Sequence, residues 1–125
     1  MLLWIAIGGA AGALARYGLS GWVHTRLGES FPWGTLVVNA CGCLALGFFL
    51  RYVEGTTVSP EARGMVAIGV LGAFTTFSTF SWEAVMLIRD GAWARATAYI
   101  STSVLIGLGA LFAGVAAAAA LRLRG

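Results

Sequence analysis

Long apolar stretches separated by short polar connections dominate the pattern of this chain. Four such stretches stand out, at residues 2–22, 33–52, 64–88 and 96–121. Each is close to the ~20 residues that an α-helix needs to cross the hydrocarbon layer of a bilayer. The connections contain helix breakers, such as Pro32 and Pro60, and most of the charges. The pattern predicts an all-α membrane protein in which residues 1–125 form a single four-span domain.

Aromatic residues near the ends of the four stretches agree with this prediction. Tryptophan and tyrosine gather where a membrane helix meets the headgroup layer. The residues at such positions are Trp4, Trp22, Trp33, Tyr52 and Trp93.

The composition separates this chain from soluble domains. It is 59% hydrophobic and only 10% charged, whereas soluble domains carry roughly 25% charged residues. All eight basic residues are arginines, scattered along the chain, and the net charge is +3. Because no basic patch forms, we expect the lipid bilayer, and no nucleic acid, as a partner.

The arginines are balanced between the two sides of the membrane. With four spans, the termini and the middle connection share one side, and the two outer connections share the other. The two sides hold four arginines each, namely Arg51, Arg63, Arg122 and Arg124 against Arg16, Arg26, Arg89 and Arg95. The positive-inside rule needs a bias between sides. Without one, the chain is expected to insert in both orientations and to pair as an antiparallel homodimer, unless loop lengths or the first helix fix one orientation.

Small size and glycine content also favour a dimer, because four helices cannot easily enclose a polar path and shield it from lipid. Gly8 and Gly12 form a GxxxG pair, and Gly107, Gly109 and Gly114 lie in the fourth stretch. Glycines let helix backbones approach closely in lipid. The same glycines can equally serve packing within one subunit.

Polar side chains inside the apolar stretches are candidate functional residues, since they are costly in a membrane. Arg16 lies in the first stretch and Asn39 in the second. Arg16 either has a buried electrostatic role or snorkels to the interface. The Asn39 amide either ties two helices together or offers N–H donors to an anion. In the fourth stretch, Tyr99 and Ser103 are four residues apart and share one helix face.

The third stretch contains the run FTTFSTFSWE, residues 74–83, which combines hydroxyl groups with aromatic rings. Phe77 and Phe80 fall on one helical stripe together with Phe74. Gly69 and Gly72 precede the run and predict a helix break near Gly72–Thr76. A break inside a membrane is tolerated where it is buried in protein or faces a polar cavity.

The chemistry of this run suits a small, hard anion. The edge of an aromatic ring is positive, and hydroxyl and amide groups donate hydrogen bonds. Alternatively, the rings fill space and the hydroxyls bond back to their own helix.

The chain resembles the Fluc family of bacterial fluoride channels over nearly its whole length. The resemblance rests on GGAAGALARY (residues 8–17), on Asn39 followed by Gly42, and on GVLGAFTTFSTFSWE (residues 69–83). It implies passive fluoride export through two pores of an antiparallel, dual-topology homodimer in the bacterial inner membrane. Ala73 departs from the family pattern, in which a second glycine is expected.

The resemblance also implies roles for particular residues. It places Asn39, Phe77 and Phe80 along the fluoride pore, with Ser78 and Thr79 beside them, and it places Tyr99 and Ser103 on a polar track. It further implies a structural Na⁺ at the dimer centre, held by the backbone carbonyls of Gly72 and Thr75.

No enzyme is expected, because no Walker-type loop, histidine cluster or nucleophile–base pair appears. The alternative function is a small multidrug-type four-helix exporter. Such an exporter is expected to keep a buried carboxylate in the first span, and none lies between Met1 and Arg26.

Overall fold

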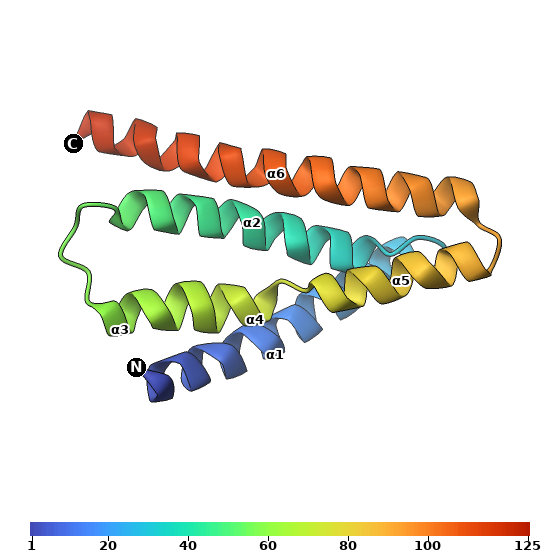
Figure 1. Cartoon of the computed structure of the whole chain (residues 1–125), viewed down its shortest axis with the longest axis horizontal. Coiled ribbons are helices and arrows are strands. Elements are labelled where there is room, and N and C mark those ends of the chain that lie inside the picture. The colour runs from blue at the N-terminus through green and yellow to red at the C-terminus, as the bar shows by residue number, and fades with distance from the viewer.

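The computed structural model describes residues 1–125, which form four helical spans and no strand (Figure 1). All four are long and apolar enough to cross a membrane. The first span is α1 (Leu2–Leu27), the second is α2 (Trp33–Val53) and the fourth is α6 (Trp93–Arg124). The third is assembled in chain order from α3 (Pro60–Arg63), η1 (Gly64–Leu71), α4 (Gly72–Phe74) and α5 (Phe77–Arg89).

The helices extend beyond the apolar stretches that predicted them. α1 continues to Leu27 and α6 runs from Trp93 to Arg124, because polar residues at the ends of a span remain helical after the apolar pattern stops. The third span begins with α3, where the Ser59 hydroxyl accepts a hydrogen bond of 3.2 Å from the Ala62 N–H. This is a helix N-cap of the usual kind.

Glycines bring the helix backbones into contact within the subunit. α1 lies against η1 and α4, and α2 lies against α6. A Cβ atom on Gly8 would collide with the Met65 carbonyl, and one on Gly12 would collide with the Val70 carbonyl. Gly114 of α6 meets the α2 backbone in the same way. Packing within one subunit is therefore confirmed for these three glycines, whereas a Cβ atom on Gly109 would have no neighbour within 4 Å.

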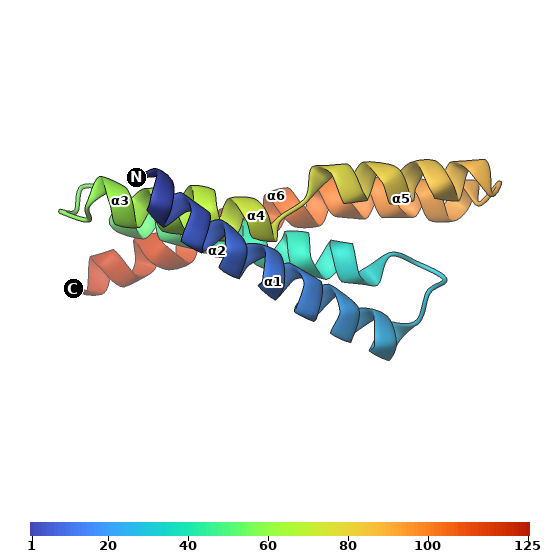
Figure 2. The ribbon, with the colours of Figure 1, turned by 90° about the horizontal axis from the view of Figure 1, so that it is seen from below.

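The third span is broken in its middle, as predicted (Figure 2). Thr75 and Thr76 are extended, with φ/ψ of −81°/154° and −149°/115°. Gly72 itself is helical, so the break lies three residues beyond the glycine that predicted it. Before the break, η1 has π-type hydrogen bonding, a wider turn that hydrophobic periodicity does not reveal.

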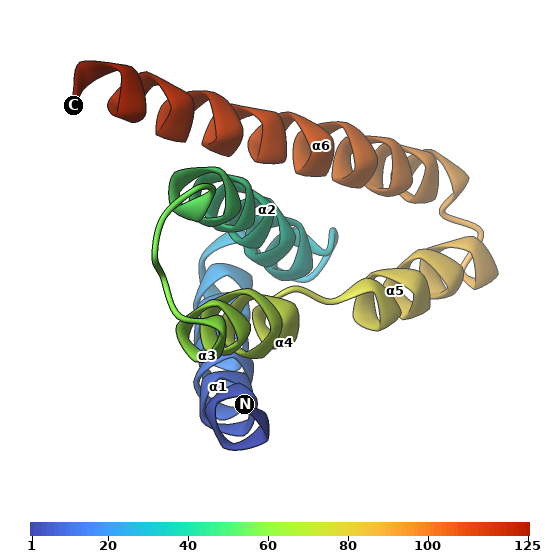
Figure 3. The same cartoon turned by 60° about the vertical axis from the view of Figure 1, so that its left-hand side comes forward.

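The two ends of the molecule differ in how closely the spans pack. Figures 2 and 3 show α5 lying apart from α1, and no contact joins these two helices. α5 packs instead against α6, where Leu36, Ala84 and Tyr99 form a small buried cluster. The space between α1, α2 and α5 is lined by polar side chains, among them Arg16 and Thr79 of the residues predicted from the sequence.

Candidate functional site

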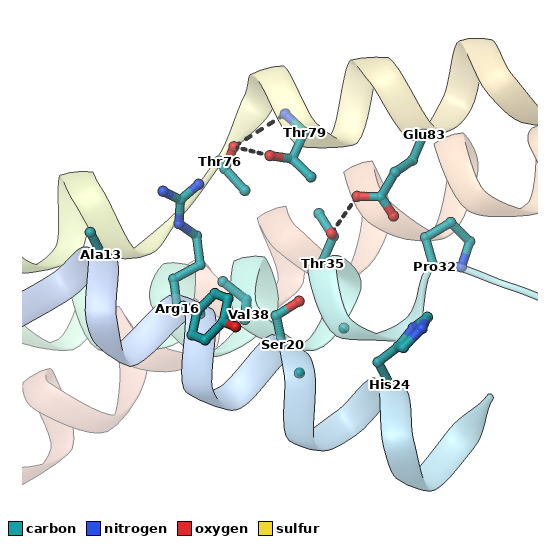
Figure 4. Close-up of a pocket in the computed structure, with 13 residues that line it drawn as sticks. Ala13, Arg16, Ser20, His24, Pro32, Thr35, Val38, Thr76, Thr79 and Glu83 are labelled. Carbon is teal, nitrogen blue, oxygen red and sulfur yellow. Dashed lines mark hydrogen bonds between the residues drawn. The ribbon is translucent and has the colours of Figure 1, made fainter. Parts of the chain in front are cut away.

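A cleft of about 420 Å³ opens between α1, α2 and α5, beside the break in the third span (Figure 4). α1 contributes Arg16, Tyr17, Ser20 and His24 to its lining, α2 contributes Thr35 and Val38, and the third span contributes Thr76, Thr79 and Glu83. Most of these side chains are polar, which is unusual at membrane depth and marks a functional candidate.

The Asn39 side chain of α2 hydrogen-bonds the backbone at the break in the third span. Its Oδ1 accepts a hydrogen bond of 2.8 Å from the Thr76 N–H, and its Nδ2 donates one of 3.1 Å to the Thr76 carbonyl. One amide thus satisfies both backbone groups of an extended residue. The alternative that Asn39 ties two helices together is therefore confirmed. The amide nitrogen carries a second N–H, and the role of Asn39 as an anion donor stays a prediction.

The hydroxyl groups of the third span fall into two sets. The Thr76 hydroxyl caps α5 by accepting from the Thr79 N–H at 3.2 Å, and it lies 3.0 Å from the Thr79 hydroxyl and 3.4 Å from the Ser78 hydroxyl. Thr79 lines the cleft, whereas Ser78 is exposed. The hydroxyls of Thr75 and Ser81 instead donate to carbonyls four residues earlier. Local back-bonding therefore accounts for only these two.

The phenylalanines after the break begin an aromatic row that continues onto α6. The ring centroids of Phe77 and Phe80 are 5.6 Å apart, and those of Phe80 and Tyr99 are 5.2 Å apart. Phe31 adds an edge-to-face contact with Tyr99 at 5.4 Å. The break separates Phe74 from this row and places it against Gly42 of α2. Sequence reasoning did not single out Phe31.

Tyr99 and Ser103 supply two polar atoms without partners. Tyr99 is fully buried, and neither its hydroxyl nor the buried Ser103 hydroxyl makes a hydrogen bond within the chain. Buried polar groups nearly always have a partner, which can be a water, an ion or another chain. Their predicted place on a polar track is untested, but both donors are available to an outside partner.

A further pair in the cleft was missed by sequence reasoning. The Thr35 hydroxyl donates a short hydrogen bond to the Glu83 carboxylate (Figure 4). Thr35 is 6% exposed, so this bond replaces water around a buried hydroxyl. One feature of the sequence could have identified Glu83 as a site residue. Thr76, Thr79 and Glu83 are three and four residues apart and therefore share one helix face.

Arg16 reaches into the cleft from α1 toward the extended linker that carries Thr76 (Figure 4). It lies eleven residues before the end of α1 at Leu27 and is half-buried. The Arg51–Glu54 ion pair and the His24–Glu29 contact are made by other residues. The arginines that donate hydrogen bonds are Arg51, Arg95 and Arg122. Arg16 therefore makes no ion pair or hydrogen bond within the chain, and its positive charge faces the cleft.

The backbone at the break leaves carbonyl oxygens without their helical donors. In a continuous helix, the Gly72 carbonyl would accept from Thr76 and the Thr75 carbonyl from Thr79. Here the Thr76 N–H donates to Asn39, and the Thr79 N–H donates to the Thr76 hydroxyl. Freed carbonyls are the ligands that hard cations prefer at broken membrane helices. The chain has no cluster of three or more His, Cys, Asp or Glu side chains suited to a metal ion.

Comparison with known proteins identifies relatives along nearly the whole chain. The fluoride-specific ion channel FluC of Opitutus terrae is 47% identical over 124 residues, covering 97% of this chain and 94% of that protein. The protein of the same name from Thermus thermophilus is 46% identical over 112 residues, covering 90% and 88%. A family model described as CrcB-like protein, Camphor Resistance (CrcB), matches residues 3–115. Four membrane spans, a broken third helix and this match together establish that the chain is a multi-pass membrane protein and belongs to the CrcB-like family.

Proposed function

We propose that this chain is a fluoride-selective ion channel of the bacterial cell membrane, through which fluoride leaves the cell passively and without a catalytic step. Relatives with 44–47% identity carry the name fluoride-specific ion channel. The observation that supports the proposal is the break at Thr75–Thr76. The Thr79 hydroxyl that follows it lines a polar cleft in mid-span, and the rings of Phe77 and Phe80 form a row toward Tyr99 of α6, outside the cleft lining.

These groups suit an anion that holds its water strongly. Along the path, protein groups replace the donors of the water shell. They are the second N–H of Asn39, the hydroxyls of Ser78 and Thr79, and the positive ring edges of Phe77 and Phe80. Tyr99 and Ser103 add donors that have no partner within the chain. The charge of Arg16 attracts anions into the cleft.

The channel is proposed to be an antiparallel, dual-topology homodimer with two pores. Phe77 is 79% exposed, and Ser78 is exposed beside it. A lone subunit would place that hydroxyl in lipid, which is costly, whereas a second copy gives both residues a protein partner. Since Arg16 lies inside a span, the arginine balance outside the membrane is four against three, still nearly unbiased.

Topology is tested by labelling a C-terminal tag from each side of the membrane. The proposal expects labelling from both sides. Three lysines added at the C-terminus should bias insertion and lower flux, and co-expression with an oppositely biased copy should restore it. Labelling of the unmodified chain from one side alone contradicts dual topology.

A structural Na⁺ at the dimer centre is the second element of this assembly. The carbonyls of Gly72 and Thr75 would hold it, two from each subunit, because both lack helical donors. The ion supplies positive charge that ties the two broken helices together. Dimers purified in N-methylglucamine in place of Na⁺ are expected to dissociate more readily and to regain stability when Na⁺ returns. Equal stability in both buffers contradicts the site.

The runner-up is a small multidrug-type exporter. α1 has no carboxylate, but Glu83 lies in the cleft, so this alternative keeps a candidate proton carrier. The two functions differ in energy coupling, since a channel needs no proton gradient.

Fluoride efflux from liposomes that contain only this protein tests the function. A fluoride electrode should record fast efflux driven by the fluoride gradient alone, with little chloride movement measured in parallel. Efflux that matches empty liposomes, or that requires a proton gradient, contradicts the proposal.

A further inference from the structure

His24, the one histidine of the chain, stands at the outer end of the cleft. It lies three residues before the end of α1 and on the same cleft lining as Arg16 (Figure 4). The step of eight positions from Arg16 to His24 corresponds to about 12 Å along the helix. Its side chain is 48% exposed, so it meets water on one side and the cleft on the other. Of the two side chains, His24 lies closer to the end of α1 and Arg16 lies deeper along the cleft.

The charges that face His24 come from several elements. The nearest is Glu29 in the connection after α1, whose Oε1 lies 3.2 Å from Nε2 of His24. α5 contributes Glu83, and Asp90 follows directly after α5; both line a second hollow together with His24 and Glu29. α2 contributes no charged side chain to either cavity.

The arginines nearby are already engaged or lie deeper. On α1 itself, Arg26 stacks over the Trp22 ring at 5.5 Å. On α6, Arg95 donates to the Ser30 carbonyl at 2.9 Å. The mouth of the cleft is therefore rich in carboxylates, and His24 is the one side chain there that becomes positively charged when it binds a proton.

We propose that His24 is an anion-collecting residue of the permeation path, and that its protonation increases fluoride entry at this mouth. This inference rests on the proposed function. When His24 is neutral, the carboxylates around it repel anions from the mouth. When it is protonated, the added positive charge offsets Glu29 and raises the local fluoride concentration. The channel then conducts better in acid.

The experiment records fluoride current through single dimers in planar bilayers at pH 8 and pH 5.5. Current is the suitable readout, because neutral hydrogen fluoride crosses lipid without carrying charge. One charge about 10 Å from the path in water is expected to change the current on the order of twofold, with the larger current at pH 5.5. The difference should shrink as an impermeant salt is raised from about 10 mM to 1 M, since the Debye length falls from about 30 Å to 3 Å.

Three variants isolate the charge from other effects of pH. His24→Gln should give a current near the pH 8 level at both pH values. His24→Lys, which is charged at both, should give a current near the acid level throughout. Glu29→Gln should raise the current at both pH values, because a repelling carboxylate is gone.

Each outcome separates this inference from the proposed function. Fluoride current that is equal at both pH values in the unmodified chain overturns the role of His24 and leaves the channel intact. A His24→Gln variant that keeps the full pH dependence overturns that role as well. The absence of any fluoride current overturns the proposed function and this inference with it.

Discussion

The two halves of the third span differ both in polarity and in their surroundings. Residues 64–74 carry no polar side chain, whereas residues 77–89 carry three hydroxyl groups and Glu83. Before the break, Gly64–Leu71 and Gly72–Phe74 lie in backbone contact with α1, at Gly8 and Gly12. After it, Phe77–Arg89 leaves α1, packs against α6 and presents polar groups to the cleft. The first half packs closely against its neighbour and has no polar side chain. The second half packs less closely and holds the polar groups of the cleft. The break lets one span do both.

The largest expected effect comes from disturbing the packed half. Gly12→Ala adds a Cβ atom that meets the Val70 carbonyl, and backbone cannot move aside as a flexible side chain does. We expect loss of most of the folded protein, since overpacking of this kind costs ~1–3 kcal/mol or more. Size-exclusion chromatography and the melting temperature provide the measurement.

Gly9→Ala is the matched control, because a Cβ atom at Gly9 has no neighbour within 4 Å. It should elute and melt like the unmodified protein. Normal behaviour of Gly12→Ala would show that the α1–η1 contact is looser than described.

The next effect in size is expected at the break itself. Asn39→Val removes both hydrogen bonds to Thr76 and the N–H that we propose donates to the anion. A hydrogen bond to a charged group is worth ~1.5–3 kcal/mol, so flux should fall roughly tenfold to a hundredfold. Liposome efflux per dimer measures this, with the exposed Cys41→Val on the same helix as control. A folded Asn39→Val dimer with normal flux refutes the role.

How much was predictable depended on the sequence distance between interacting groups. Local patterns predicted the four spans, the position of the break and the Phe77–Phe80 pair, because these follow from neighbours on one helix. The bonds of Asn39 to Thr76 and of Thr35 to Glu83 join residues 37 and 48 positions apart, and no local period encodes them. The π-helix and the intrachain partners of Gly8 and Gly12 were likewise decided by tertiary packing. Dual topology, the Na⁺ and the pore roles stay predictions.

A smaller effect is expected from the Thr35–Glu83 pair. Thr35→Val keeps the shape but leaves the Glu83 carboxylate without its hydroxyl donor. We expect flux to fall about tenfold, at the lower end of the range for a charge-assisted bond. Thr35→Ser, which keeps the hydroxyl, should restore most of it. Equal efflux rates for the valine and serine variants would remove this pair from the path.

The smallest effect is expected where a hydroxyl serves only its own helix. The Ser81 hydroxyl donates to the Phe77 carbonyl at 2.9 Å, so Ser81→Ala should change flux by less than about twofold. Thr79→Val, which removes a hydroxyl that lines the cleft, should reduce flux more. Efflux assays on the two variants side by side decide this. A larger loss of flux for Ser81→Ala than for Thr79→Val would remove the Thr79 hydroxyl from the path.

The sharpest test of the division between the two halves is fluoride efflux for Phe77→Leu, Phe80→Leu and Phe74→Leu, each first checked for intact dimer. Apolar swaps of similar volume cost little in packing, so they remove mainly the positive ring edge. We expect the first two to lower flux in stable dimers, whereas Phe74→Leu, packed against Gly42 before the break, should affect dimer stability more than flux. Unchanged flux in Phe77→Leu and Phe80→Leu dimers would mean that the second half does not carry the anion.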